Sequence, residues 1–525
     1  MDRLTLQVDT ANTIGELQPV SDTLCVWDFR MFDDGAFGIA CPDGWFKQTY
    51  PFIRQVILMT FTGGKGYNEW YTEDAYGTPL YNFSIPMRVL HNVLRQGIVP
   101  LLVVGQTPSA LSVKPEDGGD SCGWGNRYRP KDYLKYYNYI YTFAEALVNE
   151  FGMETVRQWV FRIGTEPDNK SWWQETEEEY FRLYDYTVAA LENVLGHKQV
   201  FVFPGNLEKV DSFENLFKHC AQDINFCTGQ KGTSCCSFSV SDYSFAPAID
   251  MLPSKIQMMK ERINDFPELQ IREINIGEGQ FISDGTPPCA TVPHRLKMAQ
   301  VGVEHGASWQ AALYDISQEY GLRYYANWAY CCDFSRSQEP FIKTPAYHAA
   351  LAMSRFNGYH LQVTGGGIQE NGNRVNAVAA LSPDHHVQAV VYNHHDKWKE
   401  IPCDVEVQFQ NTSWKKVEVT FWCIDHTHNN VFTNWLEVSK DITRIESNAD
   451  FDVLGSIVET EVFNTLSIED RAFWIKKKHE YAKQNKCEIT QQMIFTAESG
   501  CLTVPLHLEG HSVWIMEIIQ LDKTV

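Results

Sequence analysis

A glutamate at the end of an apolar run is the first group in the sequence that could do chemistry. Glu166 follows the strand-like residues 159–163 and is followed at once by Pro167, which cannot continue a strand ladder. A carboxyl held half in an apolar wall has a raised pKa, so it can hold a proton near neutral pH. We therefore expect Glu166 to serve as a general acid and base. The alternative is an ordinary surface glutamate at a strand end.

Cleavage of an acetal needs a second carboxylate, and the segment 269–281 offers two. Glu278 ends an apolar run and is flanked by Gly277 and Gly279, which allow a close approach by a ligand or an unusual backbone conformation. Glu273 lies inside the same run, next to Arg272, where an internal ion pair is the competing interpretation. We predict Glu278 as the nucleophile, with Glu273 as the alternative.

These residues need a scaffold that brings distant strand ends together. Short apolar runs alternate with helical patterns between about residues 20 and 352, which predicts parallel βα units. The expected strands include 55–61, 98–104, 199–203, 235–239, 270–276 and 307–313. This length fits a (β/α)8 TIM barrel better than an open doubly wound sheet, and no glycine-rich phosphate motif indicates a nucleotide cofactor. In a barrel, the active site lies at the carboxyl ends of the strands.

The remaining residues have a different pattern. Residues 353–525 contain strands of alternating polarity, which predict an accessory antiparallel β-sandwich domain with one inserted helix at 467–484. The strand expected at 3–8, within residues 1–19, can join that sandwich. We therefore expect an N-terminal strand, a catalytic barrel over 20–352 and a sandwich over 353–525.

Composition excludes several partners. The chain of 525 residues carries a net charge of −22, which disfavours nucleic acid and anionic membranes as partners. No basic and apolar leader opens the sequence, so we expect a cytoplasmic protein whose 14 cysteines are mostly reduced; a secreted chain trimmed of its leader is the alternative. No Cys/His set has zinc spacing, so no metal and no cofactor are expected. The sequence does not indicate an oligomeric state.

Several motifs, in this order, resemble glycoside hydrolases of family 39 in clan A. The segments VRQWVFRIGTEPDNKSWW and EEYFRLYDYT resemble the family's fourth-strand region, which places its acid/base at Glu166. IVPLLVVGQTPSAL (98–111) and PKDY (130–133) resemble its third-strand region, and CIDHTHNNVFTNW (423–435) resembles its sandwich signature. Together these motifs span most of the chain. The resemblance implies a barrel, a sandwich and a retaining mechanism.

The pocket expected for the sugar departs from the family pattern. Thr165 stands where the family has the asparagine that contacts the sugar, Ser241 replaces a histidine, and Gly277 replaces the threonine before the nucleophile. Tyr243 is kept and could tune the nucleophile. Further sugar contacts are expected from Gln106, Trp173 and Trp309, although Trp309 could equally pack inside the barrel.

The function that these residues predict is a retaining glycoside hydrolase acting on a plant- or microbial-type oligosaccharide or polysaccharide. Two alternatives stay open. A catalytically silent carbohydrate-binding relative would explain the altered pocket, and an endo-acting clan A glycosidase would need an open groove. The sugar and the linkage are not predicted.

Overall fold

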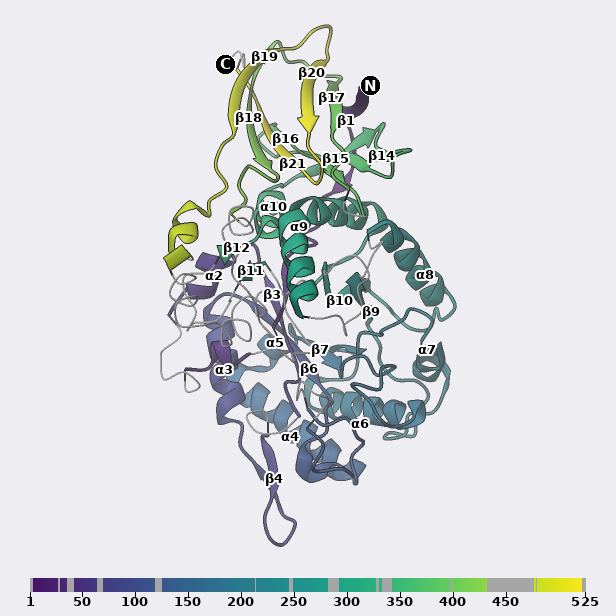
Figure 1. The fold of residues 1–525 in the computed structure, drawn as a ribbon. Coiled ribbons are helices and arrows are strands. Elements are labelled where there is room, and N and C mark those ends of the chain that lie inside the picture. The colour runs from purple at the N-terminus through teal and green to yellow at the C-terminus, as the bar shows by residue number, and fades with distance from the viewer. Residues whose placement is uncertain are drawn as a thin grey trace.

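The computed structural model describes most of the chain, and all that follows concerns those residues. They are 3–26, 29–34, 42–63, 69–118, 125–212, 214–244, 249–281, 292–326, 330–332, 342–396, 399–431, 476–477 and 479–521. Figure 1 shows a larger α/β part that carries a β-sheet part at one end, with both chain termini beside the sheet. Of the helices in these ranges, none is long and apolar enough to cross a bilayer.

The α/β part is built on parallel strands. Five of them form one sheet in the order β2 (Thr23–Val26), β3 (Gln55–Leu58), β6 (Val99–Val104), β7 (Val160–Ile163) and β8 (Phe201–Pro204). A parallel pair, β9 (Ser237–Ser244) and β10 (Glu273–Phe281), continues the curve through a bridge between Leu207 and Val240. Because all seven run the same way, their carboxyl ends lie on one side.

A short segment after the longest helix connects β10 back to the first strand. Tyr325 makes a parallel bridge to Ile276, and its amide N donates to the carbonyl O of Val20 at 3.1 Å. The predicted strand at 307–313 is wrong, because these residues lie within helix α9 (Val292–Tyr320). They are buried almost completely, and a short, wholly buried apolar run has the same composition in a helix as in a strand.

Further helices cover the outside of the parallel strands (Figure 1). They include α3 (Ser84–Arg95), α4 (Tyr133–Phe151), α6 (Glu177–Leu195), α7 (Glu214–Gln222) and α8 (Leu252–Asn264), whereas α10 (Pro345–Met353) packs against α9 and β18. The side chain of Asp132 caps α4 by accepting from the amides of Leu134 and Lys135. Thr176 caps α6 in the same way, and Gly152 and Gly196 follow the two helices at positive φ.

The β part is a ten-stranded sheet whose strands pair antiparallel except at one place. Its order is β19 (Gln491–Thr496), β18 (Lys416–Ile424), β21 (Val513–Gln520), β16 (Val387–His394), β15 (Arg374–Leu381), β13 (Tyr359–Thr364), β1 (Leu4–Glu16), β17 (Cys403–Gln410) and β20 (Leu502–Leu508), with β14 (Gly367–Ile368) beside β15. The exception is β1, which lies parallel to β17 and antiparallel to β13. Side chains from eight strands enclose a core separate from that of the parallel strands, so the sheet folds over itself.

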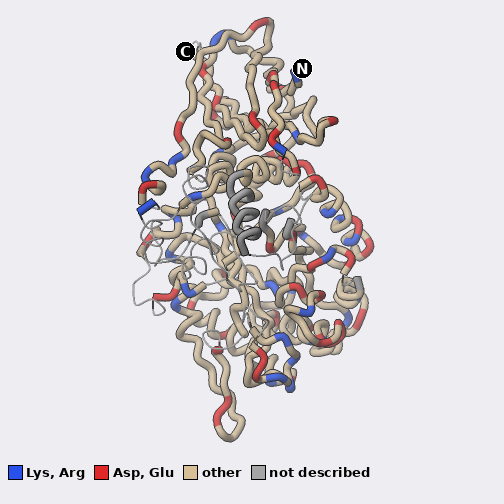
Figure 2. The backbone as a smooth tube through the Cα atoms, in the orientation of Figure 1, with Lys and Arg blue, Asp and Glu red and all other residues tan. Residues whose placement is uncertain are grey.

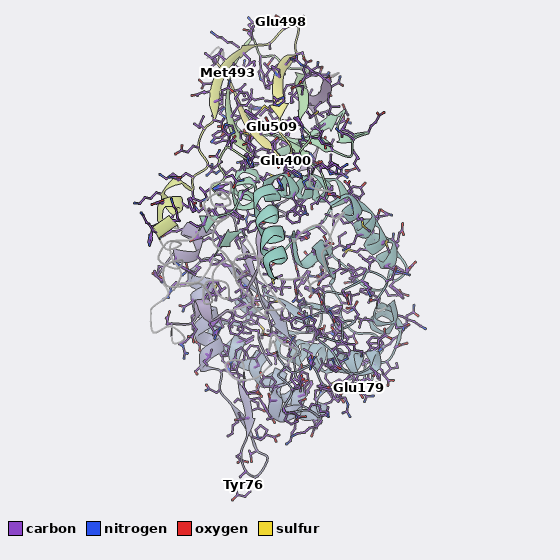
Figure 3. The ribbon with its side chains drawn as sticks, in the orientation of Figure 1. Tyr76, Glu179, Glu400, Met493, Glu498 and Glu509 are labelled. Carbon is purple, nitrogen blue, oxygen red and sulfur yellow. The ribbon has the colours of Figure 1, made fainter. Side chains whose placement is uncertain are left out.

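Charged residues of both signs are interspersed along the described tube (Figure 2). Figure 3 shows Glu400 and Glu509 at the junction of the two parts, and Tyr76 at the tip of the β4–β5 hairpin (Tyr71–Glu73 and Pro79–Tyr81) at the far end. Of the helix predicted at 467–484, residues 476–477 and 479–484 are helical, and the rest lies outside the described residues.

Candidate active site

Glu166 stands at the carboxyl end of β7, in a backbone conformation that turns the chain out of the sheet. Its φ is 37°, in the left-handed region that a residue with a side chain rarely adopts. Two main-chain bonds hold this turn: the amide of Glu166 donates to the carbonyl of Asn206 at 3.0 Å, and the amide of Asn169 donates to the carbonyl of Glu166 at 2.9 Å. With Pro167 next, the strand cannot continue, so Glu166 stays at the rim.

The surroundings of the Glu166 carboxyl favour its protonated form. The residue is 5% exposed, and burial together with the negative charge of Glu278 raises its pKa to about 8. Hydrogen bonds from Ser241 and from Asn169 Nδ2, the latter at 2.9 Å, oppose this shift only in part. A carboxyl with this pKa carries a transferable proton at neutral pH.

Glu278 lies on β10, opposite Ser241 of β9. The pairing of these strands slips by one residue between Ile276 and Glu278, so a local irregularity sets the direction of the Glu278 side chain. Glu278 is 1% exposed. Its charge acts on Glu166, so the two carboxyls lie within electrostatic reach although 112 positions separate them in the printed sequence.

The two glycines beside Glu278 are needed for packing within the protein. A Cβ at position 279 would lie 2.6 Å from Tyr325 Oη, and one at 277 would collide with the Ser239 hydroxyl. The sequence suggested that these glycines allow a ligand to approach or the backbone to adopt an unusual conformation. The structure shows instead that neighbouring side chains occupy the space over both.

Asn206, two residues beyond β8, connects the two carboxyls. Its Nδ2 donates to the Ser241 hydroxyl, which bonds to Glu166, and lies 3.5 Å from Glu278 Oε2. Asn206 is fully buried, and its Oδ1 has no partner within the described chain. Sequence reasoning missed this residue; its only signal is that an amide follows the run Phe201–Pro204 at a strand end.

A buried arginine lies beneath the carboxyls and was also missed. Arg162 on β7 is fully buried; it donates from one terminal nitrogen to Thr165 Oγ1 at 2.8 Å and from the other to the Gly277 carbonyl at 3.2 Å. The Thr165 hydroxyl, predicted as a sugar contact, is thus engaged by Arg162. Burial raises the pKa of Cys25 well above its ordinary value. The charge of Glu278 raises this pKa further and that of Arg162 lowers it, so both charged groups lie near the same thiol.

The other predicted sugar contacts are placed differently. Gln106 follows β6 and is 9% exposed, and its buried Oε1 has no partner among the described residues. Trp173 donates from Nε1 to the Thr176 carbonyl at 2.9 Å, and Trp309 packs edge to face on Tyr325 from within α9. Both tryptophans are almost fully buried. The backbone of Tyr243 lies in β9, but its side chain is outside the described part.

Glu273 is the first residue of β10 and precedes Glu278 by five positions. Five residues of extended strand span about 16 Å, so the two glutamates belong to different ends of the parallel sheet. Burial raises the pKa of Glu273, while Arg323 and a hydrogen bond from Asn275 lower it. These neighbours are not shared with Glu166.

Side chains that could bind a metal ion come together in the β part, away from the two carboxyls. Within the described residues, one group could hold a metal ion: Cys423 in β18, with Asp425 and His428 in the turn after that strand. Asp425 already accepts from the amides of Thr427 and His428, both at 2.7 Å, which closes a turn. The group belongs to the ten-stranded sheet, whereas Glu166 and Glu278 belong to the parallel strands.

Comparison with known proteins gives several similar sequences. A β-xylosidase of Geobacillus stearothermophilus is 33% identical over 126 residues, which span 23% of this chain and 24% of that protein. A β-xylosidase of Caldicellulosiruptor saccharolyticus is 38% identical over 110 residues, 20% of this chain and 22% of that one. The matched segments thus span about a quarter of the length of these curated relatives.

Solved structures show the same fold over the whole chain. A monomeric β-xylosidase from Caulobacter crescentus CB15 superposes with a TM-score of 0.72 at 15% identity, covering 99% of this chain and all of that one. A family 39 enzyme from Xanthomonas axonopodis pv. citri gives 0.70 at 14% identity, covering 99% and 98%. The family model described as Glycosyl hydrolases family 39 matches residues 67–454, more than half of the sequence. The chain therefore belongs to glycosyl hydrolase family 39.

Proposed function

We propose that the protein is a retaining O-glycosyl hydrolase that uses Glu166 as acid/base and Glu278 as nucleophile. The observation that carries this proposal is the bridged pair of carboxyls, in which burial and the charge of Glu278 raise the pKa of Glu166 to about 8. The barrel that we propose has eight strands, with Tyr324–Ala326 as the eighth, because this segment bonds to both β10 and Val20. The division into a barrel over 20–352 and a sandwich over 353–525 is part of the same proposal.

In the first step, Glu278 attacks the anomeric carbon while Glu166 donates its proton to the departing glycosidic oxygen. The attack turns Glu278 into a neutral ester, so the charge that raised the pKa of Glu166 disappears. Glu166 then gives up protons more readily, which suits its second role as the base that activates water. Asn206 and Ser241 hold both carboxyls in register, and Gln106 offers a free acceptor to a sugar hydroxyl.

Glu273 is the less suitable nucleophile, because it stands at the amino end of β10. The substrate that we propose is a glycoside of plant or microbial origin, and an aryl β-xyloside is the first probe because two similar proteins are named β-xylosidases. Thr165, Ser241, Tyr243, Trp173 and Trp309 stay predicted contributors to the pocket.

Leaving-group dependence tests the role of Glu166. Glu166→Gln should lower kcat/KM roughly 10²–10⁴-fold on alkyl glycosides and far less on aryl glycosides with good leaving groups, because only poor leaving groups need the proton. Steady-state kinetics on a panel of aryl glycosides measures this slope. A uniform loss across the panel would remove Glu166 from the acid role.

The stereochemistry of the product tests retention and separates the alternatives. Proton NMR of the first-formed sugar should show the substrate's anomeric configuration, and azide should restore a glycosyl azide product to Glu278→Ala. An inverted product contradicts the double displacement. A chain that binds oligosaccharides in calorimetry yet hydrolyses nothing in a broad panel would be the silent carbohydrate-binding relative.

A further inference from the structure

A cavity of about 530 Å³ lies between helix α10 and the outward-facing side chains of the β-sheet. Helix α10 and the turn after it contribute one wall through Tyr347, His348 and Arg355, and strands β18 and β21 contribute the other through Trp422 and Glu517. None of the lining residues belongs to the Glu166–Glu278 site. Cavities of this size accommodate small organic ligands.

The charge of this cavity is opposite to that of the protein. Lys343, Arg355 and Lys486 line it against a single acid, Glu517, whereas the chain as a whole carries −22. Within the described ranges, none of the three cations has a carboxylate at ion-pair distance; the Lys343 ammonium lies instead 4.9 Å from the centre of the Tyr347 ring. Cations without protein counter-ions attract an anionic ligand.

Buried polar atoms in the wall also lack partners. His348 is 3% exposed, and its Nδ1 has no hydrogen bond to any described residue. Burial and the neighbouring Lys343 lower the pKa of His348 to about 4, so the ring is neutral at physiological pH and offers one donor and one acceptor. Gln388 Oε1 is a second buried acceptor without a partner in the described chain. A buried polar atom left unpaired is costly, so a ligand that pairs with it gains affinity.

The third property of the cavity is an apolar, aromatic surface. Trp422 is half-buried on β18, and Phe356 and Ile515 lie almost fully buried beside it. A flat indole edge or face next to amide and imidazole groups suits the CH surface and the hydroxyls of a pyranose ring. An anion with a purely polar surface would leave this wall unused.

We propose that this cavity binds a small anionic sugar, a single pyranose that carries a carboxylate or a phosphate, at a site separate from the catalytic carboxyls. The basic residues hold the charged group, His348 and Gln388 pair with hydroxyls, and Trp422 contacts the ring. Because α10 and the sheet form opposite walls, the ligand contacts both parts of the molecule.

Calorimetric titration of the full chain tests the proposal with four probes: glucuronate, glucose 6-phosphate, neutral glucose and inorganic phosphate. Binding of at least one charged sugar is expected, weakening as salt rises. Arg355→Gln and Lys343→Gln should each weaken it about tenfold, and Glu517→Gln should tighten it. Glu278→Gln should leave it unchanged, and because calorimetry needs no turnover, the outcome does not depend on the proposed hydrolysis.

The pattern among the probes identifies the source of the charge. Binding of glucuronate alone indicates a sugar carboxylate, and binding of glucose 6-phosphate alone indicates a sugar phosphate. The proposal is overturned if neither binds at roughly 10 mM, if glucose binds as tightly as the charged sugars, or if inorganic phosphate matches glucose 6-phosphate.

A chemical footprint gives a second measurement that needs no substitution. The half-buried Cys487 thiol lines the same cavity, so a bound sugar should slow its alkylation by iodoacetamide, followed by peptide mass spectrometry. Cys501, which is half-buried as well, serves as the matched control because it lies just before β20 and outside the cavity. Equal alkylation rates at Cys487 with and without a sugar that binds in calorimetry would place that sugar elsewhere and overturn the assignment.

Discussion

Strand β10 carries one glutamate at its amino end, Glu273, and another in its carboxyl half, Glu278, and the neighbours of the two differ in kind. Glu278 is fully buried near a second carboxyl, and Asn206 and Ser241 connect the pair. At the amino end, Glu273 is opposed by Arg323 and bonded by Asn275. Like charges placed together cost stability, whereas opposite charges offset burial. The position along the strand, rather than the residue type, therefore decides which neighbours each glutamate has.

Replacing each of the two glutamates by glutamine should give the largest difference in kcat between them. Glu278→Gln removes the proposed nucleophile and should lower kcat by roughly 10⁴-fold or more, the scale seen when one member of a catalytic unit is lost. Glu273→Gln should change kcat by less than about threefold, since it lies a strand's length away. Steady-state kinetics on an aryl glycoside measures both. The reverse order of effects would assign the nucleophile to Glu273.

Two buried asparagines provide a matched pair for the next largest effect. Asn206→Ser removes the donor between the carboxyls and should lower kcat/KM about 10²-fold, as the loss of one preorganised donor does. Asn275→Ser removes a comparable donor, which bonds Ser237 Oγ at 2.7 Å at the other end of β10, and should leave kcat/KM nearly unchanged.

Thermal unfolding of both asparagine variants serves as the control, because each substitution leaves a cavity. Similar losses of Tm with different losses of activity would show that Asn206 acts on the carboxyls. Equal losses of activity would show that neither asparagine acts beyond packing.

The pH dependence of kcat/KM separates Glu166 from Glu273 by a smaller effect. Burial and Glu278 raise the pKa of Glu166 to about 8, so its acid form is present below that pH and is lost above it. We expect kcat/KM to fall tenfold per pH unit above about pH 8 on substrates with poor leaving groups. Glu166→Gln should abolish this limb, and Glu273→Gln should keep it. A wild-type limb that persists in Glu166→Gln belongs to another group.

The smallest effect is on stability. Folding raises the pKa of Glu273 above its ordinary 4.5, so the native state binds the extra proton and stability falls as pH rises past that value. Glu273→Gln removes this dependence. Its Tm should exceed that of the wild type slightly at pH 8 and match it near pH 4. A Tm lower than that of the wild type at pH 8 but not near pH 4 would show that the Arg323 interaction outweighs the cost of burial.

Much of the scaffold follows from local patterns. Short apolar runs bounded by turn residues predict strands at 55–61 and 98–104, and the observed strands β3 and β6 lie within these ranges. The caps at Asp132 and Thr176 and the glycines after α4 and α6 are equally local signals. Polarity alternation predicted most strands of the β part, although β13, β14 and β19 were missed.

The errors in the predicted secondary structure came where contacts distant in sequence decide between a helix and a strand. Residues 307–313 are buried on all sides, which removes the polarity pattern that separates a helix from a strand. Tyr324–Ala326 were missed as a strand because three residues are too few for any pattern, and their pairing depends on Ile276 and Val20. Trp309 was predicted near the eighth strand for the same reason, and it lies inside helix α9 instead.

For the site, sequence reasoning predicted the two carboxyls but not what connects them. Glu166 follows β7 and Glu278 lies toward the carboxyl end of β10, and the apolar runs in the sequence indicate both positions. The roles of Asn206 and Arg162 depend on side chains that meet across four strands, and nothing beside them in the sequence distinguishes them from other buried polar residues.

The position of strand β1 has a consequence for how the molecule is made. Residues 4–16 lie inside the sheet between β13 and β17, with Leu6 and Val8 fully buried in its core. Strand β1 therefore leaves the ribosome some 350 to 400 residues before the strands that pair with it, and until they emerge its apolar edge is unprotected. Once β17 pairs with β1, one sheet holds both ends of the intervening α/β chain. Synthesis of the α/β part must therefore be complete before β1 can take its final position.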